Sequence, residues 1–278
     1  MPELPEVQTI VNDLIEANLA GSTIRAVRVN WPRSVAGMSP AAFSRRLKGA
    51  VVRSISRRAK YIVFSLGSGR TVLLHLRMSG RLRLVAAGAA PDRHEHVCIA
   101  FTDGRELRLH DTRKFARLYL CGPDESILAA LGPEPLSPDF TLGRLSAMLR
   151  TRARMLKPLL LDQRVIAGLG NIYVDEALWE AGLHPCRRAR TLSSDERKRL
   201  FDAIPRVLKR GLANMGTALG AGEANFLSVA GRRGTNRQQL RVFRRTGLPC
   251  PRCGAAVERI IVGQRSTHIC PDCQRQHH

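Results

Sequence analysis

The sequence has no long hydrophobic run and holds few acidic residues. Its 278 residues carry 45 Lys and Arg against 23 Asp and Glu, a formal net charge of +22. No apolar stretch approaches the ~18 residues that a membrane-spanning helix needs. The first twenty residues contain no Lys or Arg, so the basic start of a secretory signal is also missing. These absences predict a protein of the cytoplasm that does not enter a membrane.

The excess of positive charge predicts a polyanionic partner. Lys and Arg drive binding to nucleic acid by neutralising phosphates, so nucleic acid is the first candidate. A ribosomal protein, or a basic surface that is merely solvated, is the alternative on charge alone. Hydrophobic residues make up 44% of the chain, which is enough for a globular core in one large or two modest domains.

Four of the seven cysteines lie close to the end of the chain. Cys250, Cys253, Cys270 and Cys273 match the C-x2-C…C-x2-C spacing of a tetrahedral structural zinc site. The residues between the two pairs predict two short strands, VERIIV and STHI, around a turn at Gly263. Because all four ligands are cysteines, the site has no open position for catalysis, and we expect one structural Zn²⁺ ion.

The remaining chain divides by its patterns. An apolar stripe from Val7 to Ile15 predicts an opening helix. Residues 23–120 consist of short alternating or apolar runs separated by turn signals, which is typical of a β-sandwich or barrel. Residues 131–140 hold three prolines and indicate a linker, whereas residues 141–215 predict four helical segments. Residues 220–239 are rich in Gly and polar side chains and predict a mobile segment.

The opening stretch MPELPEV has a chemical interpretation. A small residue after Met1 permits removal of the methionine, which leaves Pro2 with a free secondary amine. An α-amino group titrates near ~8, well below the ~10.4 of Lys, and a helix N-terminus disfavours its protonated form further. A neutral amine can attack an electrophilic carbon, with Glu3 as acid or base. The plainer alternative is an ordinary helix start, which Pro5 and Glu6 also suit.

Several motifs follow one another along the whole chain. They are MPELPEV, RRAKY at 57–61, HLRMSGRL at 75–82, DTRKF at 111–115, LGPEPL, KPLLLDQRVIAGLGNIYVDEALWEAGLHP and GQRSTHICPDCQ. In this order they resemble the bacterial formamidopyrimidine-DNA glycosylases, enzymes of base-excision repair. The resemblance implies a cytoplasmic protein that is associated with the nucleoid when bound to DNA.

The resemblance also implies an α+β fold of several parts. An N-terminal helix and β-sandwich would form the catalytic domain, residues 1–131, followed by a linker, 132–140. A helix–two-turns–helix domain with a mobile lesion loop would cover 141–239, and a four-Cys zinc finger would cover 240–278. Damaged double-stranded DNA would lie between the domains of a monomer.

The implied reaction is excision of oxidised purines followed by strand cleavage at the abasic site. By resemblance, Pro2 forms a Schiff base with C1′ and Glu3 protonates the sugar ring oxygen. Lys60 in RRAKY matches the lysine that assists β-elimination, and Arg265 in GQRSTH matches the arginine of δ-elimination. From the sequence alone, either cation can equally be a solvated surface charge.

The resemblance further assigns residues to DNA binding. Met78, Arg113 and Phe115 match residues that fill the gap left by the flipped nucleotide, although Met78 and Phe115 also suit a core. His94, Arg152 and Asn171 match DNA contacts, and His75 and Lys157 are expected to contact phosphate. Asn171 also suits a helix N-cap, and Glu176 matches an acid near the family's active site.

Two alternatives to this function stay open. The stretch SVAGRRGTNRQQL lacks the acid-Gly turn and the aromatic that the family carries before its zinc finger. The preferred lesion is therefore uncertain, and an endonuclease VIII-like glycosylase for oxidised pyrimidines is the second enzyme candidate, although Leu4 favours the purine branch. A non-catalytic, zinc-dependent DNA-binding protein is the third candidate. The set Pro2, Glu3 and Lys60 argues against it, since a binder has no use for a terminal amine.

Overall fold

The computed structural model describes residues 1–122, 127–219 and 226–276. Its residues form two compact units, Met1–Ala129 with Asn214–Thr235, and Ala130–Ala213 with Asn236–His278. The described residues of the segment after α6, 214–219 and 226–235, belong to the first unit, although they follow the helical segments in the sequence. The boundaries that the sequence suggests for the individual domains stay predictions.

The first unit starts with the predicted helix. Helix α1 (Leu4–Glu16) has Pro5 in its first turn and buries Val7, Ile10 and Leu14 along one face. This face packs on strands β3 (Val52–Arg58) and β4 (Tyr61–Leu66). Burial of each such side chain contributes about 1.5–3 kcal/mol to stability, so the apolar stripe fixes which side of α1 faces the sheets.

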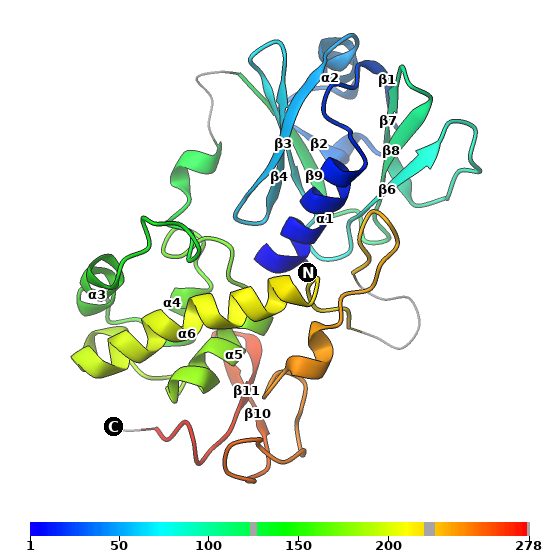
Figure 1. Ribbon diagram of the computed structural model, residues 1–278. Helices are drawn as coiled ribbons and strands as arrows, with labels where there is room; N and C mark the ends of the chain where they lie inside the picture. The colour runs from blue at the N-terminus through cyan, green and yellow to red at the C-terminus, as the bar shows by residue number, and fades with distance from the viewer. Residues whose placement is uncertain (123–126, 220–225, 277–278) are drawn as a thin grey trace. The chain divides into compact units, whose positions relative to one another are not determined.

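Two sheets form the body of this unit, at the top of Figure 1. Among the described residues, one sheet has the order β1-β7-β8-β6, with bounds Ile24–Val29, Glu95–Phe101, Arg105–His110 and Arg81–Ala86. The other has the order β2-β9-β5-β4-β3, in which β2 is Val35–Ala36, β9 is Arg117–Cys121 and β5 is Thr71–His75. Side chains of both sheets and of α1 share one core. The predicted β-sandwich with an N-terminal helix is therefore confirmed.

One helix of this unit departs from the strand-like prediction for residues 23–120. Helix α2 (Pro40–Leu47) follows the short 3-10 helix η1 (Pro32–Ser34) and buries Phe43 and Leu47. The Ser39 side chain accepts a hydrogen bond from the Ala42 N–H at 3.2 Å. Ser at an N-cap followed by Pro at the first helical position is a start signal that the sequence carries.

The second unit contains the predicted helical segments. They are α3 (Leu142–Arg150), α4 (Leu156–Leu160), α5 (Asn171–Ala181) and α6 (Ser194–Ala213), with 3-10 turns η2 (Ile127–Ala130), η3 (Ala189–Thr191) and η4 (Asn236–Gln239) nearby in the chain. Helices α5 and α6 pack closely at Gly211. A Cβ atom at this position would lie 2.5 Å from the hydroxyl oxygen of Tyr173, so only glycine leaves enough room. The predicted strands of the finger are β10 (Glu258–Val262) and β11 (Arg265–Ile269), which pair antiparallel.

One predicted helical segment is only half helical. After α4 the chain turns into an irregular loop over residues 161–170. The Gln163 amide organises this loop by donating to the carbonyls of Leu161 and Leu169, while its oxygen accepts from the Gly168 N–H. Part of the predicted mobile segment, residues 220–225, lies outside the described residues.

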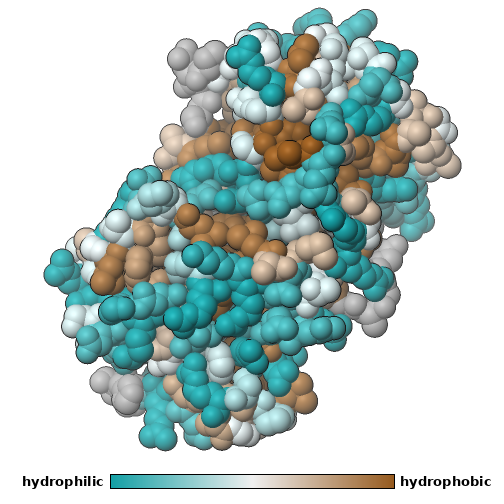
Figure 2. Space-filling view, viewed as in Figure 1, coloured by the Kyte–Doolittle hydropathy of each residue, from teal (hydrophilic) through white to brown (hydrophobic). Residues whose placement is uncertain are grey.

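The surface is largely hydrophilic on the face shown in Figure 2. Within the described part of the chain, no helix combines the length and the apolar character that crossing a membrane requires.

Candidate active site

The start of α1 is buried in the first unit. Pro2 is buried and Glu3 is 2% exposed, although Met1 is exposed. The Glu3 N–H donates to Oε2 of Glu6 at 2.8 Å, and Oε1 of Glu6 accepts from the Thr217 N–H at 2.7 Å. A Cβ on Gly216, which has φ +80°, would lie 2.8 Å from the Glu6 side chain. The turn at 216–217 is thereby held against the first residues of the helix.

Lys60 lies in the tight turn between β3 and β4. The turn is possible because Ala59 adopts a left-handed conformation with φ 53°. Lys60 is 5% exposed. The Arg57 side chain donates to the Gln8 side chain on α1 at 2.9 Å and to the Ala59 carbonyl at 3.0 Å. These bonds tie the turn that carries Lys60 to the helix that carries Pro2 and Glu3.

His75 is the last residue of β5 and pairs with Tyr61 across the sheet. Burial, together with the nearby positive charges of Arg77 and Lys60, lowers the pKa of His75 from 6.5 to about 3. Its Nδ1 accepts a hydrogen bond from the Arg77 N–H at 2.9 Å, so Nε2 carries the proton. The imidazole is therefore neutral at physiological pH and can only donate a neutral hydrogen bond to a phosphate.

Met78, Arg113 and Phe115 lie on two loops of the same unit. Met78 is 42% exposed on the loop between β5 and β6, and Phe115 is 43% exposed on the loop between β8 and β9. The Arg113 guanidinium carbon lies 4.8 Å from the centre of the Phe115 ring. Neither apolar side chain belongs to the core, so the packing alternative does not hold for them.

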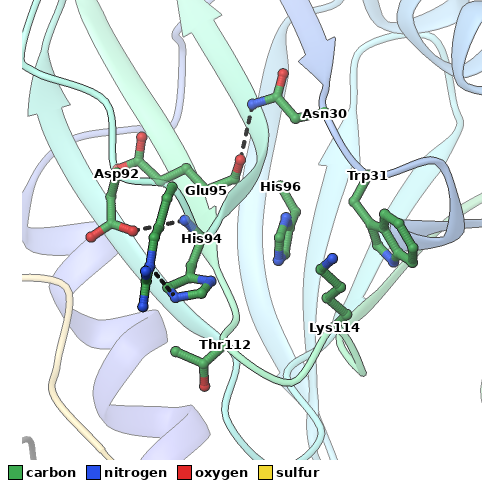
Figure 3. A pocket seen from close by; sticks show the side chains of 9 residues that line it. Asn30, Trp31, Asp92, His94, Glu95, His96, Thr112 and Lys114 are labelled. Atoms are coloured by element: carbon green, nitrogen blue, oxygen red, sulfur yellow. Dashed lines mark hydrogen bonds between the residues drawn. The ribbon is translucent and has the colours of Figure 1, made fainter.

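His94 lines a surface pocket of about 580 Å³ at the start of β7 (Figure 3). Its Nε2 accepts a hydrogen bond from the Arg93 side chain at 2.9 Å, and its N–H donates to Asp92 at 2.8 Å. Lys114 reaches the same pocket, with its ammonium nitrogen 4.2 Å from the centre of the Trp31 ring. The pocket thus begins beside the loop that carries Arg113 and Phe115.

The four cysteines converge in the second unit. Their Sγ atoms all lie within 4.8 Å of one another, with 3.9 Å between Cys250 and Cys273 and 3.3 Å between Cys253 and Cys270. A tetrahedral zinc ion with Zn–S bonds of about 2.3 Å separates its sulfurs by about 3.8 Å, so the cluster fits zinc. The Trp179 indole N–H donates to the Cys250 sulfur at 3.4 Å. The residues present therefore suit a zinc ion, with Trp179 on α5 supporting one ligand.

Arg265 is exposed at the start of β11. Gly263 and Gln264 form the two-residue hairpin turn before it, both with positive φ, as a type I′ turn requires. A Cβ on Gly263 would lie 2.8 Å from Pro158 of α4, so the turn needs Gly there. Asn171 donates from Nδ2 to the Ser266 carbonyl at 3.0 Å.

Two predictions for this unit need correction. Asn171 is the first residue of α5, and Gly170 is the N-cap. Lys157, expected to contact phosphate, is 0% exposed, and its ammonium donates to Asp175 at 2.5 Å and to the Ser266 carbonyl at 2.9 Å. A cation enclosed in this way presents no donor to DNA. Arg152, by contrast, is partly exposed beyond α3.

Three family profiles match successive parts of the chain. They are the formamidopyrimidine-DNA glycosylase N-terminal domain over residues 1–118, the H2TH domain of that glycosylase over 131–221, and the zinc finger found in FPG and IleRS over 247–276. The formamidopyrimidine-DNA glycosylase of Protochlamydia amoebophila is 45% identical over 276 residues, covering 99% of this chain and all of the relative. That of Herpetosiphon aurantiacus is 47% identical over 279 residues with the same coverage. The chain belongs to the formamidopyrimidine-DNA glycosylase family.

Solved structures agree with this assignment. A Lactococcus lactis FPG mutant in complex with a Fapy-dG containing DNA matches with a TM-score of 0.91 and 34% identity, over 99% of this chain and all of that one. MutM (FPG) protein from Thermus thermophilus matches with a TM-score of 0.89 and 37% identity at the same coverage. The predicted formamidopyrimidine-DNA glycosylase family, the α+β fold and the four-Cys zinc finger are confirmed, and the chain is an enzyme of this glycosylase family.

Helix α5 carries two buried acidic residues, of which the sequence singled out Glu176 but not Asp175. Glu176, which matches an acid near the family's active site, is buried and accepts the N–H groups of Arg241, Val242 and Phe243 at 2.9–3.1 Å. Burial raises the pKa of Glu176 in spite of these bonds. Its neighbour Asp175 accepts from the N–H and the ring of His268. Helix α5 thus anchors the segment that leads into the zinc finger and the finger itself.

Proposed function

We propose that this chain is a bifunctional DNA glycosylase and abasic-site lyase that removes oxidised purines from double-stranded DNA. The observation that carries the proposal is the buried start of α1, where Pro2 and Glu3 lie in the same unit as Lys60 and a neutral His75. An amine at the positive end of a helix is shifted towards its neutral, nucleophilic form. Relatives of this fold bind DNA with Fapy-dG or carbocyclic 8-oxo-G, which supports the substrate class.

The reaction starts after Met1 has been removed. The Pro2 nitrogen attacks C1′ and loses its proton, while the bond from C1′ to the base breaks and the base leaves with the electron pair and a proton. Glu3 protonates the sugar ring oxygen, so that the ring opens and C1′ becomes part of an iminium. Loss of a C2′ proton then expels the 3′ phosphate, assisted by Lys60. Loss of a C4′ proton in a second elimination, assisted by Arg265, then expels the 5′ phosphate, and water hydrolyses the iminium to release the sugar fragment from Pro2.

The remaining site residues hold the DNA. His75, His94, Arg152 and Asn171 contact the backbone, and His75 donates from Nε2 because its Nδ1 already accepts a bond. Met78 and Phe115 enter the base stack, and Arg113 faces the base opposite the lesion. A single zinc ion held by the four cysteines stabilises the finger and takes no part in the chemistry. The enzyme acts as a monomer on the DNA of a bacterial nucleoid.

Borohydride trapping on DNA with an abasic site tests the lyase part. Reduction fixes an iminium as a stable covalent complex, so untagged protein lacking Met1 should be trapped. A variant extended before Pro2 should not be trapped, since its Pro2 nitrogen is an amide. Equal trapping of both forms would exclude the terminal amine as nucleophile, and no trapping of either would favour a DNA-binding protein without lyase chemistry.

A direct comparison of lesions tests the substrate class. Single-turnover excision of 8-oxoguanine should exceed excision of thymine glycol from otherwise identical duplexes. Faster excision of thymine glycol would favour the oxidised-pyrimidine branch instead.

A further inference from the structure

One buried carboxylate connects the two loops that carry the exposed apolar side chains. Asp111 directly follows β8 and is 1% exposed. Its Oδ2 accepts the N–H groups of Phe115 and Ala116, both at 2.7 Å, and its Oδ1 accepts the Arg113 N–H at 3.2 Å. Three backbone donors of the β8–β9 loop therefore converge on one side chain.

The same carboxylate reaches the other loop. Oδ1 of Asp111 also accepts the Ser79 hydroxyl at 2.5 Å, and Ser79 follows Met78 directly. The two loops also touch, because a Cβ on Gly80 would lie 3.1 Å from the Cβ of Ala116. A carboxylate has about four lone-pair sites, and here each site has one donor.

The backbone of Asp111 is fixed to β7. Its N–H donates to the His94 carbonyl at 3.0 Å, and its carbonyl lies 2.8 Å from Nε2 of His96. The side-chain bonds therefore start from a rigid point of the sheet. Thr112 and Lys114 of the same loop line the pocket in Figure 3, beside His94 and His96.

A side chain that enters a base stack is effective only if it is held in a fixed orientation. Unstacking a base step costs free energy, and immobilising a mobile side chain on binding adds to that cost. The exposed Met78 and Phe115 are not held by a core. Their orientation depends on the backbones that carry them, and Asp111 bonds to one of these backbones and to the side chain of the residue next to the other.

We propose that Asp111 is a positioning residue for base extrusion, fixing Met78 relative to Arg113 and Phe115 before DNA binds. This inference rests on the proposed function, since it takes these three side chains as the ones that fill the opened stack. Asp111 itself touches neither the lesion nor the reacting atoms. Its effect should appear in the opening of the duplex and not in the chemistry at C1′.

The test compares Asp111→Asn with the wild type in three measurements. The fluorescence of 2-aminopurine placed beside the base opposite the lesion reports opening of the base stack. The single-turnover rate of 8-oxoguanine excision from a duplex reports the complete reaction. Borohydride trapping on a single-stranded abasic oligonucleotide reports the chemistry without stack opening. An amide nitrogen accepts no hydrogen bond, so the variant loses either the N–H bonds from Phe115 and Ala116 or the N–H bond from Arg113, and the loop loosens. Loss of charge-assisted hydrogen bonds should slow excision about tenfold or more and reduce the 2-aminopurine signal, while trapping stays within about twofold.

Two further variants make the test specific. Ser79→Ala removes only the bond to the Met78 loop and should give a smaller loss, and the double variant should lose less than the sum, because both changes break the same bond. Asp103→Asn is the matched control: Asp103 also accepts a backbone N–H in a turn, that of Arg105 at 3.0 Å, and it accepts from the side chains of Ser22 and Arg105, which lie outside both loops. It should leave all three measurements unchanged.

Each outcome decides the proposal. Wild-type opening and excision in Asp111→Asn would overturn it, as would an equal fall in single-strand trapping, which would indicate a general structural role. A melting curve shows whether Asp111→Asn folds. If it does not fold, wild-type stack opening and wild-type excision in Ser79→Ala are by themselves sufficient to overturn the proposal. If the wild type fails to trap, the proposed function fails, yet the 2-aminopurine signal still tests the positioning role.

Discussion

Replacement of the buried Lys157 by Met should destabilise the second unit strongly. The Lys157–Asp175 pair is completely buried at 2.5 Å, and removal of one partner of such a pair typically costs about 3–5 kcal/mol. Asp175 keeps the N–H and ring of His268, and the Ser266 carbonyl keeps the Asn171 amide. We therefore expect a loss near the lower limit, about 3 kcal/mol.

The assay is urea unfolding followed by the fluorescence of Trp179. The chain has two tryptophans, Trp31 and Trp179, so a Trp31→Phe background reports on the second unit alone. Lys198→Met is the matched control, because Lys198 pairs with Asp202 on the exposed face of α6 and such pairs contribute about 0.3–0.5 kcal/mol.

A double variant identifies the cause of the loss. Most of the cost should come from leaving Asp175 charged and incompletely paired. Lys157→Met combined with Asp175→Asn should therefore be more stable than Lys157→Met alone. A loss below about 1 kcal/mol for the single variant would show that the buried pair does not stabilise the unit, and so would a double variant that loses the sum of both single changes.

Two other changes test the electrostatics of the site and of the finger. The folded-state pKa of His75, about 3, lies below its ordinary 6.5, so the unfolded chain binds the extra proton between these values and stability falls as the pH falls through this window. His75→Gln should reduce that slope by up to about 1.4 kcal/mol per pH unit in urea unfolding between pH 7 and 5, and identical slopes would contradict the assignment. Trp179→Phe removes the indole donor to Cys250 and should weaken zinc binding about 10–100-fold in competition with a chromogenic chelator. Trp31→Phe is its control, and equal affinities of the two variants would show that the indole bond does not support the site.

The sequence predicted those features that depend on local patterns. Alternating apolar residues predict the strands of the sandwich, and the spacing of the four cysteines predicts the finger, in which their sulfurs converge. Helix α2 was missed although Ser39 and Pro40 signal its start, because its flanks are strand-like.

Features that depend on distant partners were not predictable in this way. In the sequence, Lys157 resembles any surface cation. Its burial depends on a bond to Asp175, which lies eighteen positions further along the chain. Asp111 and Ser79 are separated by 32 positions, so nothing local marks that carboxylate as the link between two loops. Glu176 is similar, since its donors begin 65 positions further along.

The Pro2 nitrogen is the nucleophile of the proposed reaction. The most direct measurement is to trap untagged protein on abasic-site DNA with borohydride, digest the complex and locate the sugar adduct by mass spectrometry. We expect an adduct on the N-terminal peptide, at Pro2, with Met1 absent. An adduct on Lys60 or another lysine, with the N-terminal peptide unmodified, would contradict it.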